Sequence, residues 1–421
     1  MKENPLLYDL FQAYYDARKH KRNTRSQLEF EFNLEENLIK LYEELRDRTY
    51  KVGRSVCFIS EKAVKREVFA ANFRDRVVHH LLFNYTAPIF EKTFISDSYS
   101  CRKGMGTLYG VERFEHHLRS CSNNWRKPCY VLKLDIRGYF MHINRQKLYE
   151  MVMETLKRYA YRKAPDGKCW AELLDYDLLT YLMQEIIYND PTFGCEIRGT
   201  SKDWEGLPPD KSLFHVAKGC GLPIGNLTSQ LFSNVYLNIL DQYVKRVLGE
   251  KYYGRYVDDF FIIGNDRHYL LSLIPELRRF LETELNLTLH PNKVFLQHAH
   301  KGCAFLGVFV KPYRRYLLRK TKHRISGRIA YIHVRVSGED IPVKREDLQH
   351  ISCVVNSYMG YMRHMACFRF KHLLIERNAN LAKIGEFVGE QKKFIVNLPG
   401  FAPAIFRFIP LFLLLSQNLS N

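Results

Sequence analysis

The chain has 421 residues, of which 46% are hydrophobic, so it can bury a large core in two or three subdomains and is not a disordered protein. Its 64 Lys and Arg residues exceed its 45 Asp and Glu residues and give a formal net charge of +19, which favours a phosphate backbone or an acidic membrane surface as a partner. Ten cysteines occur without a CxxC pair, which argues against a zinc ribbon or a disulfide framework, and no secretory pattern follows Met1, so we expect reduced thiols and a cytoplasmic location.

The first 125 residues mix helical and strand-like patterns. Apolar side chains have helical spacing in residues 1 to about 50, and a strand-like stretch, 56–59, precedes a helical one, 76–90. Residues 99–106 form a basic, glycine-rich turn without the spacing of a nucleotide-binding P-loop. Two interpretations of this turn stay open: Arg102 and Lys103 contact a nucleic-acid template, or the turn is an ordinary surface loop.

An acidic residue ends the next strong pattern. Residues 129–135 predict a buried strand that ends at Asp135, and residues 136–140 predict a turn into a short helix. Asp135 can cap that helix, or it can be one ligand of a metal site that needs carboxylates from more than one strand. The two roles are compatible.

A long insertion and a glycine-rich turn follow. Residues 150–218 contain a helical stretch, 170–187, and a segment rich in Pro and Gly, 189–210, and we do not treat them as a separate domain. The turn at 219–226 leads into an amphipathic helix, for which Thr228 or Ser229 is a plausible N-cap. Such a turn lets the backbone approach a base pair or a phosphate closely, and a plain loop before a core helix is the alternative.

The motif Tyr256-Val257-Asp258-Asp259 places two adjacent carboxylates between apolar, aromatic runs. The flanking residues favour a strand hairpin with the carboxylates at its turn. Two neighbouring carboxylates repel each other unless a cation compensates them, so with Asp135 they indicate a site for Mg²⁺ and phosphate. A solvated turn is the alternative for the pair taken alone.

The C-terminal third is basic and helical. Basic residues concentrate between 311 and 335, among them Arg319, Lys320, Lys322 and Arg324, and this excess of positive charge is suited to the phosphates of a nucleic-acid duplex. Helical patterns occupy 345–364 and 367–384. The apolar stretch 401–416 is too short to span a bilayer and contains Pro410, so we expect no membrane association, only core packing or a partner surface of unknown role.

Together these motifs resemble, in order, the palm motifs of reverse transcriptases. The residues that carry the resemblance are Asp135 with Phe140, Leu222-Pro223-Ile224-Gly225, Tyr256-Val257-Asp258-Asp259, Pro291-Asn292-Lys293 and Phe305-Leu306-Gly307. More narrowly, residues 207–214, 224–230 and 357–364 resemble the reverse transcriptases of diversity-generating retroelements. The resemblance covers about residues 30–375.

The resemblance implies an α+β right-hand polymerase that copies a template-repeat RNA into mutagenised complementary DNA. Fingers would occupy 1–128, a palm with an antiparallel sheet and packed helices 129–318, including the fingers insertion at about 150–218, and an α-helical thumb 319–395, with the apolar tail at 396–421. Its partners would be template RNA, a DNA or RNA primer, deoxynucleoside triphosphates and a small, basic, oligomeric accessory protein.

The family's catalytic residues carry over to matching positions. Its metal ligands fall on Asp135, Asp258 and the carbonyl of Ile136, with Asp259 in a supporting position. They would hold two Mg²⁺ ions, for which Mn²⁺ could substitute. Lys293 matches a general acid that would protonate the leaving pyrophosphate, and a solvated lysine is the alternative.

The nucleotide-binding positions carry over in the same way. The matching residues are Lys62, Lys65 and Arg66 for the triphosphate, Phe140 as the steric gate against a 2′ hydroxyl, and Ile224 with Gly225 beside the nascent base pair. Phe140 can instead be an ordinary core residue, and the lysines ordinary surface charges. Many reverse transcriptases have Gln where this chain has Ile224, and we expect the loss of that hydrogen-bonding group to lower fidelity.

Two other functions stay open. A retron or group II intron-like reverse transcriptase would copy adenine faithfully. A protein of the abortive-infection type would have an inert or untemplated site, and intact Asp135, Asp258 and Asp259 argue against inertness.

Overall fold

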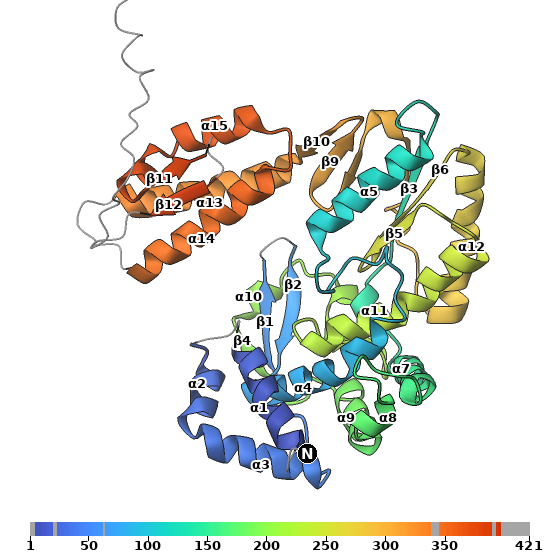
Figure 1. The fold of residues 1–421 in the computed structure, drawn as a ribbon, viewed down its shortest axis with the longest axis vertical. Coiled ribbons are helices and arrows are strands. Elements are labelled where there is room, and N and C mark those ends of the chain that lie inside the picture. Colours follow the sequence, from blue (N-terminus) through green and yellow to red (C-terminus); the bar gives the residue numbers. More distant parts are fainter. Residues whose placement is uncertain (1–4, 20–22, 62–63, 338–344, 390–392, 397–421) are drawn as a thin grey trace, which may run out of the picture. The chain divides into compact units, whose positions relative to one another are not determined.

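A computed structural model describes residues 5–19, 23–61, 64–337, 345–389 and 393–396. The chain forms two compact units, Met1–Lys301 and Gly302–Asn421 (Figure 1). Residues 302–318, which we expected in the palm, belong to the second unit, because they form a small sheet that is continuous with the helices after it.

The first unit begins with helices, as expected. Its α-helices are α1 (Pro5–Arg18), α2 (Arg25–Phe32), α3 (Leu34–Arg46), α4 (Phe73–Phe90), α5 (Thr107–Cys121), α6 (Tyr139–His142), α7 (Arg145–Ala160), α8 (Trp170–Leu173), α9 (Tyr176–Ile187), α10 (Ser201–Trp204), α11 (Leu227–Gln242) and α12 (Arg267–Leu285). Its short helices are η1 (Pro209–Lys211), η2 (Leu213–His215), η3 (Tyr243–Val247) and η4 (Ala299–Lys301). Helix α1 packs on α4, and α4 packs on α11 (Figure 1).

The main sheet of the first unit is antiparallel and has the strand order β5-β6-β3-β7. The strands are β3 (Tyr130–Asp135), β5 (Tyr253–Tyr256), β6 (Asp259–Gly264) and β7 (Phe295–His298). Phe261 of β6 packs edge-on against Phe114 of α5, with ring centroids 4.8 Å apart, while Phe260 and Ile262 belong to the main core. The central strands are therefore largely apolar, apart from Lys133 and the carboxylates at one end, because helices cover both faces of the sheet.

A second sheet, of order β2-β1-β4, stands beside the helices in Figure 1. Its strands are β1 (Val56–Ser60), β2 (Arg66–Ala70) and β4 (Glu196–Arg198), where β1 pairs antiparallel with β2 and parallel with β4. Strand β4 comes from the insertion expected at about 150–218. The insertion thus pairs with the N-terminal strands and lies within the first unit.

The second unit combines a sheet, helices and a hairpin. Its elements are β8 (Cys303–Phe305), β9 (Val308–Lys311), β10 (Arg314–Leu317), α13 (Arg319–Ser337), α14 (Arg345–Met362), α15 (Phe368–Glu376), η5 (Ala379–Lys383), β11 (Gly385–Val388) and β12 (Lys393–Val396). On α13 the buried residues Ile325, Ile329 and Ile332 recur at helical spacing and form its core face. The expected helix over 367–384 ends early, and the β11–β12 hairpin was not predicted.

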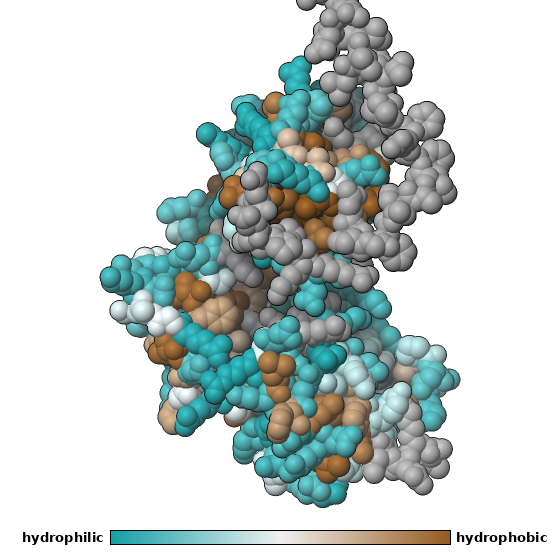
Figure 2. Space-filling model, turned by 90° about the vertical axis from the view of Figure 1, so that its left-hand side faces the viewer, coloured by the Kyte–Doolittle hydropathy of each residue, from teal (hydrophilic) through white to brown (hydrophobic). Residues whose placement is uncertain are grey.

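The α+β class with an antiparallel main sheet and packed helices is confirmed. None of the helices in the described ranges is long and apolar enough to cross a membrane. On the face drawn in Figure 2, hydrophobic side chains form small patches separated by hydrophilic ones. Of the apolar tail expected at 396–421, the residues after Val396 lie outside the described part of the chain.

Candidate active site

The expected hairpin is formed by β5 and β6, and Val257 and Asp258 make its two-residue turn. Tyr256 pairs with Asp259 at the end of the ladder. Val257 has a φ of +57°, the left-handed conformation, which a β-branched residue adopts at a cost on the order of 1–3 kcal/mol.

The end of β3 lies beside this turn. Asp135 is the cross-strand partner of Asp259, and the backbone N–H of Ile136 donates to the carbonyl of Asp258 at 3.3 Å. The helix after β3 has Gly138 as its N-cap, so Asp135 does not cap it. Strands β3 and β6 therefore bring Asp135, Asp258 and Asp259 to one edge of the sheet.

Burial and mutual repulsion shape the electrostatics of this edge. Burial and, after it, the charge of Asp135 raise the pKa of Asp258 to about 6. Burial also raises the pKa of Asp259, against the opposing charge of Lys133, whose Nζ lies 3.4 Å from Asp259 Oδ2. The Nζ of Lys293 donates to Asp135 Oδ1 at 2.8 Å, and the lysine side chain is 53% exposed. Lys293 is thus close enough to act on a group bound at Asp135.

The donor set fits a hard divalent cation held by few protein ligands. In the part of the chain that the structure describes, no group of three or more His, Cys, Asp or Glu side chains is arranged to hold a metal ion. Asp135 and Asp259 each lie beside a lysine, Lys293 and Lys133 respectively. The candidate ligands therefore stay Asp135, Asp258 and the Ile136 carbonyl, with Asp259 in a supporting position. Burial disfavours the charged form of Asp258, and a bound cation would stabilise that form. Mg²⁺ commonly completes its coordination shell with phosphate and water oxygens.

Phe140 lies half-buried on α6, the short helix that follows Asp135 in the chain. It packs against a small apolar cluster of Phe69, Met141 and Leu213, together with Ile224. Its carbonyl accepts a hydrogen bond from Leu222 N at 2.8 Å, which fixes α6 to the glycine-rich turn. The ring is partly packed and partly accessible, so both the gate and the core interpretation stay open.

The glycine-rich turn is fastened to β2. The carbonyl of Ile224 accepts a hydrogen bond from Phe69 N at 2.9 Å. Gly225 has a φ of +129°, and a Cβ there would lie 3.0 Å from the Phe69 carbonyl and from a methyl of Val68. Only glycine fits this conformation and this close approach. The strand that begins with Arg66 and the turn with Ile224 therefore form one continuous backbone surface.

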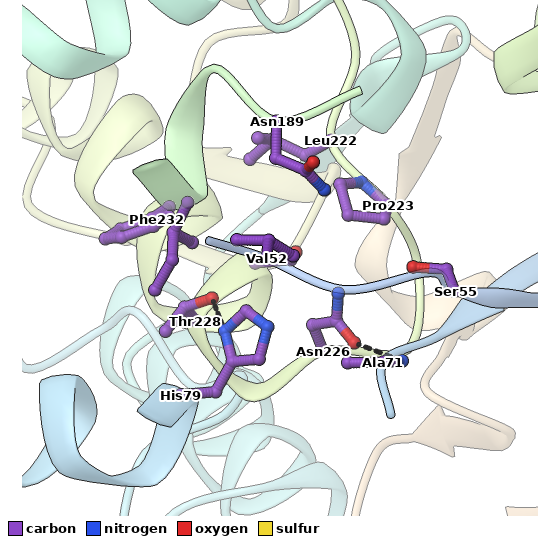
Figure 3. A pocket seen from close by; sticks show the side chains of 12 residues that line it. Val52, Ser55, Ala71, His79, Asn189, Leu222, Pro223, Asn226, Thr228 and Phe232 are labelled. Carbon is purple, nitrogen blue, oxygen red and sulfur yellow. Dashed lines mark hydrogen bonds between the residues drawn. The ribbon is translucent and has the colours of Figure 1, made fainter. Parts of the chain in front are cut away.

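Behind this surface is a cavity of about 10 Å³, about the volume of one water (Figure 3). His79 of α4 and Thr228 of α11 point toward each other there, with 2.8 Å between Nδ1 and Oγ1. The Asn226 side chain accepts from Ala71 N at 3.2 Å. Our expectation of Thr228 or Ser229 as the N-cap is wrong: Asn226 occupies that position, because Thr228 lies inside the helix and bonds His79.

The basic residues expected to hold a triphosphate differ in their surroundings. Arg66, the first residue of β2, is exposed. Burial raises the pKa of Tyr256, and the positive charge of Arg66 acts in the opposite direction. Arg66 thus acts electrostatically at the strand that carries the catalytic turn. Lys65 donates to the carbonyl of Glu205 at 2.7 Å. Lys62 lies outside the described residues.

The two basic residues of the 99–106 turn also differ. Arg102 donates to Glu91 at 2.8 Å and to the carbonyls of Ile95 and Ser98, and only 6% of its side chain is exposed. This arrangement favours a structural role over contact with nucleic acid. Lys103 is exposed.

In the second unit, the expected duplex contacts lie on α13. Arg319, Lys320 and Arg324 are exposed, whereas Lys322 is half-buried, with its ammonium 5.7 Å from the centre of the Phe370 ring. Because the buried isoleucines occupy the other face of α13, the basic side chains share its outward face.

Two buried polar centres were missed by sequence reasoning. Arg255, directly before the motif, forms a fully buried pair with Asp241 on α11. Glu67 of β2 accepts hydrogen bonds from Trp204 Nε1 at 2.8 Å, Ser212 Oγ at 2.9 Å and Leu213 N at 2.7 Å, and so holds the insertion against β2. The sequence shows only single charged residues, Glu67 and Arg255, near apolar and aromatic ones, and a solvent-facing position would explain each of them equally well.

Paired carboxylates at the edge of an antiparallel sheet, beside an exposed lysine and a backbone loop, define a site suited to phosphoryl transfer. The comparisons with known proteins then give the family. The sequence model described as reverse transcriptase (RNA-dependent DNA polymerase) matches residues 64–310, more than half of the chain. The chain belongs to the reverse transcriptase family, which agrees with the expected right-hand polymerase fold.

Curated relatives are distant. Protein YkfC of Escherichia coli strain K12 is 23% identical over 266 residues, which are 56% of this chain and 60% of that protein. The putative COX1/OXI3 intron 2 protein of Saccharomyces cerevisiae is 21% identical over 286 residues, which are 59% of this chain and 32% of that protein. The chain therefore spans less than two thirds of either relative.

Solved structures that resemble the chain include telomerases. The telomerase from Candida albicans in complex with a fragment of telomeric RNA has a TM-score of 0.44 and 9% identity, and the match covers 83% of this chain and 64% of that one. For the apo telomerase from Candida tropicalis the TM-score is 0.45 and the identity 10%, with 79% of this chain and 63% of that one covered.

Proposed function

We propose that the protein is an RNA-directed DNA polymerase that joins a primer 3′ hydroxyl to the α-phosphate of a deoxynucleoside triphosphate. The new P–O bond replaces the bond between the α-phosphate and the bridging oxygen, pyrophosphate leaves with that oxygen, and the hydroxyl proton passes to water. The family and the juxtaposition of Asp135 with buried Asp258 support this reaction. The juxtaposition is the observation that carries the proposal.

Each residue of the site has a proposed task. Asp135, Asp258 and the Ile136 carbonyl hold divalent ions, which when bound favour ionisation of the primer hydroxyl and compensate phosphate charge. Asp259 is kept in a supporting position by Lys133. Lys293, 2.8 Å from Asp135, supplies a proton to the leaving pyrophosphate. Arg66, the first residue of β2, attracts the triphosphate through its positive charge.

The finer proposal is that the template is a template-repeat RNA copied with errors opposite adenine. The supporting observation is Ile224, whose side chain packs among apolar neighbours and cannot hydrogen-bond a base. Apolar contact alone discriminates by about 1–3 kcal/mol, much less than a hydrogen-bonding site. We also propose a small, basic, oligomeric accessory protein that shares the anionic RNA, and a cytoplasmic location.

A faithful polymerase of the intron type is the second candidate. It is favoured by the match to a putative intron 2 protein. The two candidates differ in the products they make, because an intron-type enzyme would copy adenine as accurately as the other bases.

Primer extension on an RNA template rich in adenine, with Mg²⁺ and sequencing of all products, tests both the polymerase activity and the proposed errors opposite adenine. We expect the Asp258→Asn variant to lose extension by roughly a hundred- to a thousandfold, as for other groups that stabilise charge in the transition state. The matched control is Asp177→Asn, which changes an exposed residue in the first turn of α9. Equal activity of the two variants would refute the polymerase site. Errors spread evenly over all template bases would refute the mutagenic subclass.

A further inference from the structure

The turn that carries Asp258 depends on a residue in an unfavourable backbone conformation. Val257 has a φ of +57°, which glycine adopts readily and valine does not. Its side chain is partly buried and packs against the main core. The surroundings must therefore hold the peptide groups on both sides of Val257, or the turn would relax.

Both of these peptide groups have buried partners. The N–H of Val257 donates to Ser100 Oγ at 3.2 Å, and the carbonyl of Val257 accepts from Arg255 Nη1 at 3.0 Å. Ser100 is 1% exposed and Arg255 is 0% exposed. Water cannot reach Ser100 or Arg255 to compete for these hydrogen bonds, so each bond holds the turn in one geometry.

The two partners are themselves fixed from several directions. Arg255 donates through Nε and Nη2 to the two carboxylate oxygens of Asp241, at 2.7 and 2.6 Å, and through Nη2 to Ser98 Oγ at 3.0 Å. Ser100 donates to Asn234 Oδ1 at 3.2 Å, and its carbonyl accepts from Asn234 Nδ2 at 2.8 Å. Both Asp241 and Asn234 lie on α11, the helix that follows the Ile224 turn.

The backbone adds a further link. The N–H of Tyr99 donates to the carbonyl of Arg255 at 3.0 Å, and the N–H of Arg255 donates to the carbonyl of Asp97 at 2.9 Å. Residues 97–100 therefore run along the outer edge of β5. The first residues of the basic turn at 99–106 therefore contact the hairpin that carries Asp258.

We propose that Ser100 and Arg255, held by Asn234 and Asp241 of α11, are positioning residues that keep Val257 left-handed and thereby direct Asp258 toward Asp135. The proposal deepens the polymerase assignment and rests on it for its effect on catalysis. Its structural part, the restraint of the turn, is independent of that assignment. Removing Arg255 would strand the charge of buried Asp241 and endanger folding, so Ser100 is the residue to change.

The first experiment compares Ser100→Ala with Ser122→Ala. Ser122 is a matched control because it is 0% exposed and its hydroxyl also accepts a backbone N–H, that of Trp125, at 2.8 Å. Hydrogen–deuterium exchange of a peptide spanning residues 253–262 should become faster in Ser100→Ala and stay unchanged in Ser122→Ala. Unchanged exchange in Ser100→Ala would overturn the proposal, and this readout needs neither metal nor nucleotide.

The second experiment measures single-nucleotide extension. We expect Ser100→Ala to lower kcat about five- to tenfold, the factor for losing the one hydrogen bond that its hydroxyl makes to the turn, with the KM for the nucleotide unchanged. Adding Val257→Gly should restore most of kcat, because glycine keeps a positive φ without support. A reduced kcat that Val257→Gly does not restore, or an equal reduction in Ser122→Ala, would overturn the proposal. If the unchanged protein itself extends no primer, the polymerase assignment fails, while the exchange experiment still decides the restraint.

Discussion

At the residue scale, Phe140 tests how the site selects a sugar. Its half-buried ring lies on α6, the helix that follows Asp135, and packs on the same apolar cluster as Ile224. If the ring excludes a 2′ hydroxyl, Phe140→Ala should raise ribonucleotide incorporation relative to deoxynucleotide incorporation by roughly 10- to 200-fold, the range for sterically set specificity. The measurement is the ratio of kcat/KM for the two nucleotides.

A control separates this effect from a loss of packing. Phe280 is also partly buried, and its ring stacks on Tyr243 with 4.0 Å between centroids, on helices α12 and η3, which carry none of the proposed site residues. Phe280→Ala should leave the sugar ratio unchanged. A Phe140→Ala enzyme with the original ratio would show that Phe140 is only a core residue.

Ile224 tests the proposed source of errors. Ile224→Gln adds a hydrogen-bonding group while the backbone bond from Phe69 to residue 224 is kept, so misincorporation opposite adenine should fall by about tenfold or more. Ile224→Leu, which remains apolar, should retain the error spectrum. Sequencing of products from all three enzymes gives the comparison, and identical spectra would remove Ile224 from the explanation.

The sequence could predict the residues whose position follows from local pattern. Asp135 ends an apolar strand, and Asp258 lies between two such strands, so their meeting at one sheet edge follows from strand pairing. Arg102 and Ser100 could not be placed in this way. The partner of Ser100 in the turn, Val257, is 157 positions away, and a buried hydrogen bond between such distant residues leaves no periodic signal.

At the scale of elements, Gly225 allows the glycine-rich turn at 219–226 to pack closely against β2. Gly225→Ala would place a Cβ 3.0 Å from the Phe69 carbonyl at a φ of +129°, so we expect a loss of about 1–3 kcal/mol in unfolding free energy and lower activity. Gly264→Ala is the control, because its Cβ would make only ordinary contacts, 3.4 Å or more from Leu270. Chemical denaturation of both variants gives the difference, and equal stabilities would contradict the tight fit.

The contact between α4 and α11 predicts a pH dependence. Burial and, after it, the charge of Arg76 lower the pKa of His79 to about 3, against about 6.5 in the unfolded chain. The unfolded chain therefore binds a proton as the pH falls below 6.5, while folded His79 stays neutral until about pH 3. The stability present above pH 6.5 should fall by about 2 kcal/mol between pH 7 and pH 5.

The measurement is denaturant unfolding at several pH values, compared with His79→Gln. The glutamine does not titrate and can still bond Thr228, so this part of the pH dependence should disappear in the variant. Parallel pH profiles for the two proteins would show that His79 has the same pKa in the folded and unfolded states, which would contradict the prediction.

Some element boundaries could not be predicted because tertiary contacts override local signals. Thr228 and Ser229 are good caps, yet α11 begins at Leu227 because Asn226 meets β2 and Thr228 meets His79. Likewise, the sheet of β8, β9 and β10 joins residues 302–318 to the second unit, although their sequence motif resembles part of a palm.

At the scale of the whole molecule, the net charge of +19 predicts strong, salt-dependent binding of nucleic acid, but the total does not say where the strand lies. Three of the expected contacts, Arg319, Lys320 and Arg324, are exposed on α13. Some basic residues contact phosphates directly, whereas others contribute only to the overall charge. The two kinds differ in their effect on one measurable quantity, the slope of the logarithm of the binding constant against the logarithm of the salt concentration.

A triple variant of α13, with Arg319, Lys320 and Arg324 changed to Gln, should weaken binding to a primed RNA template and make that slope shallower by about 0.7 to 0.9 for each phosphate that the variant no longer neutralises. The control changes three exposed arginines of α12 to Gln, Arg267, Arg278 and Arg279, and so removes the same charge from another surface. Fluorescence anisotropy titrations between low and moderate salt give both slopes. A control as strongly affected as the α13 variant would mean that the protein attracts nucleic acid through its overall field, because a specific phosphate contact changes the counterion count only where it is made.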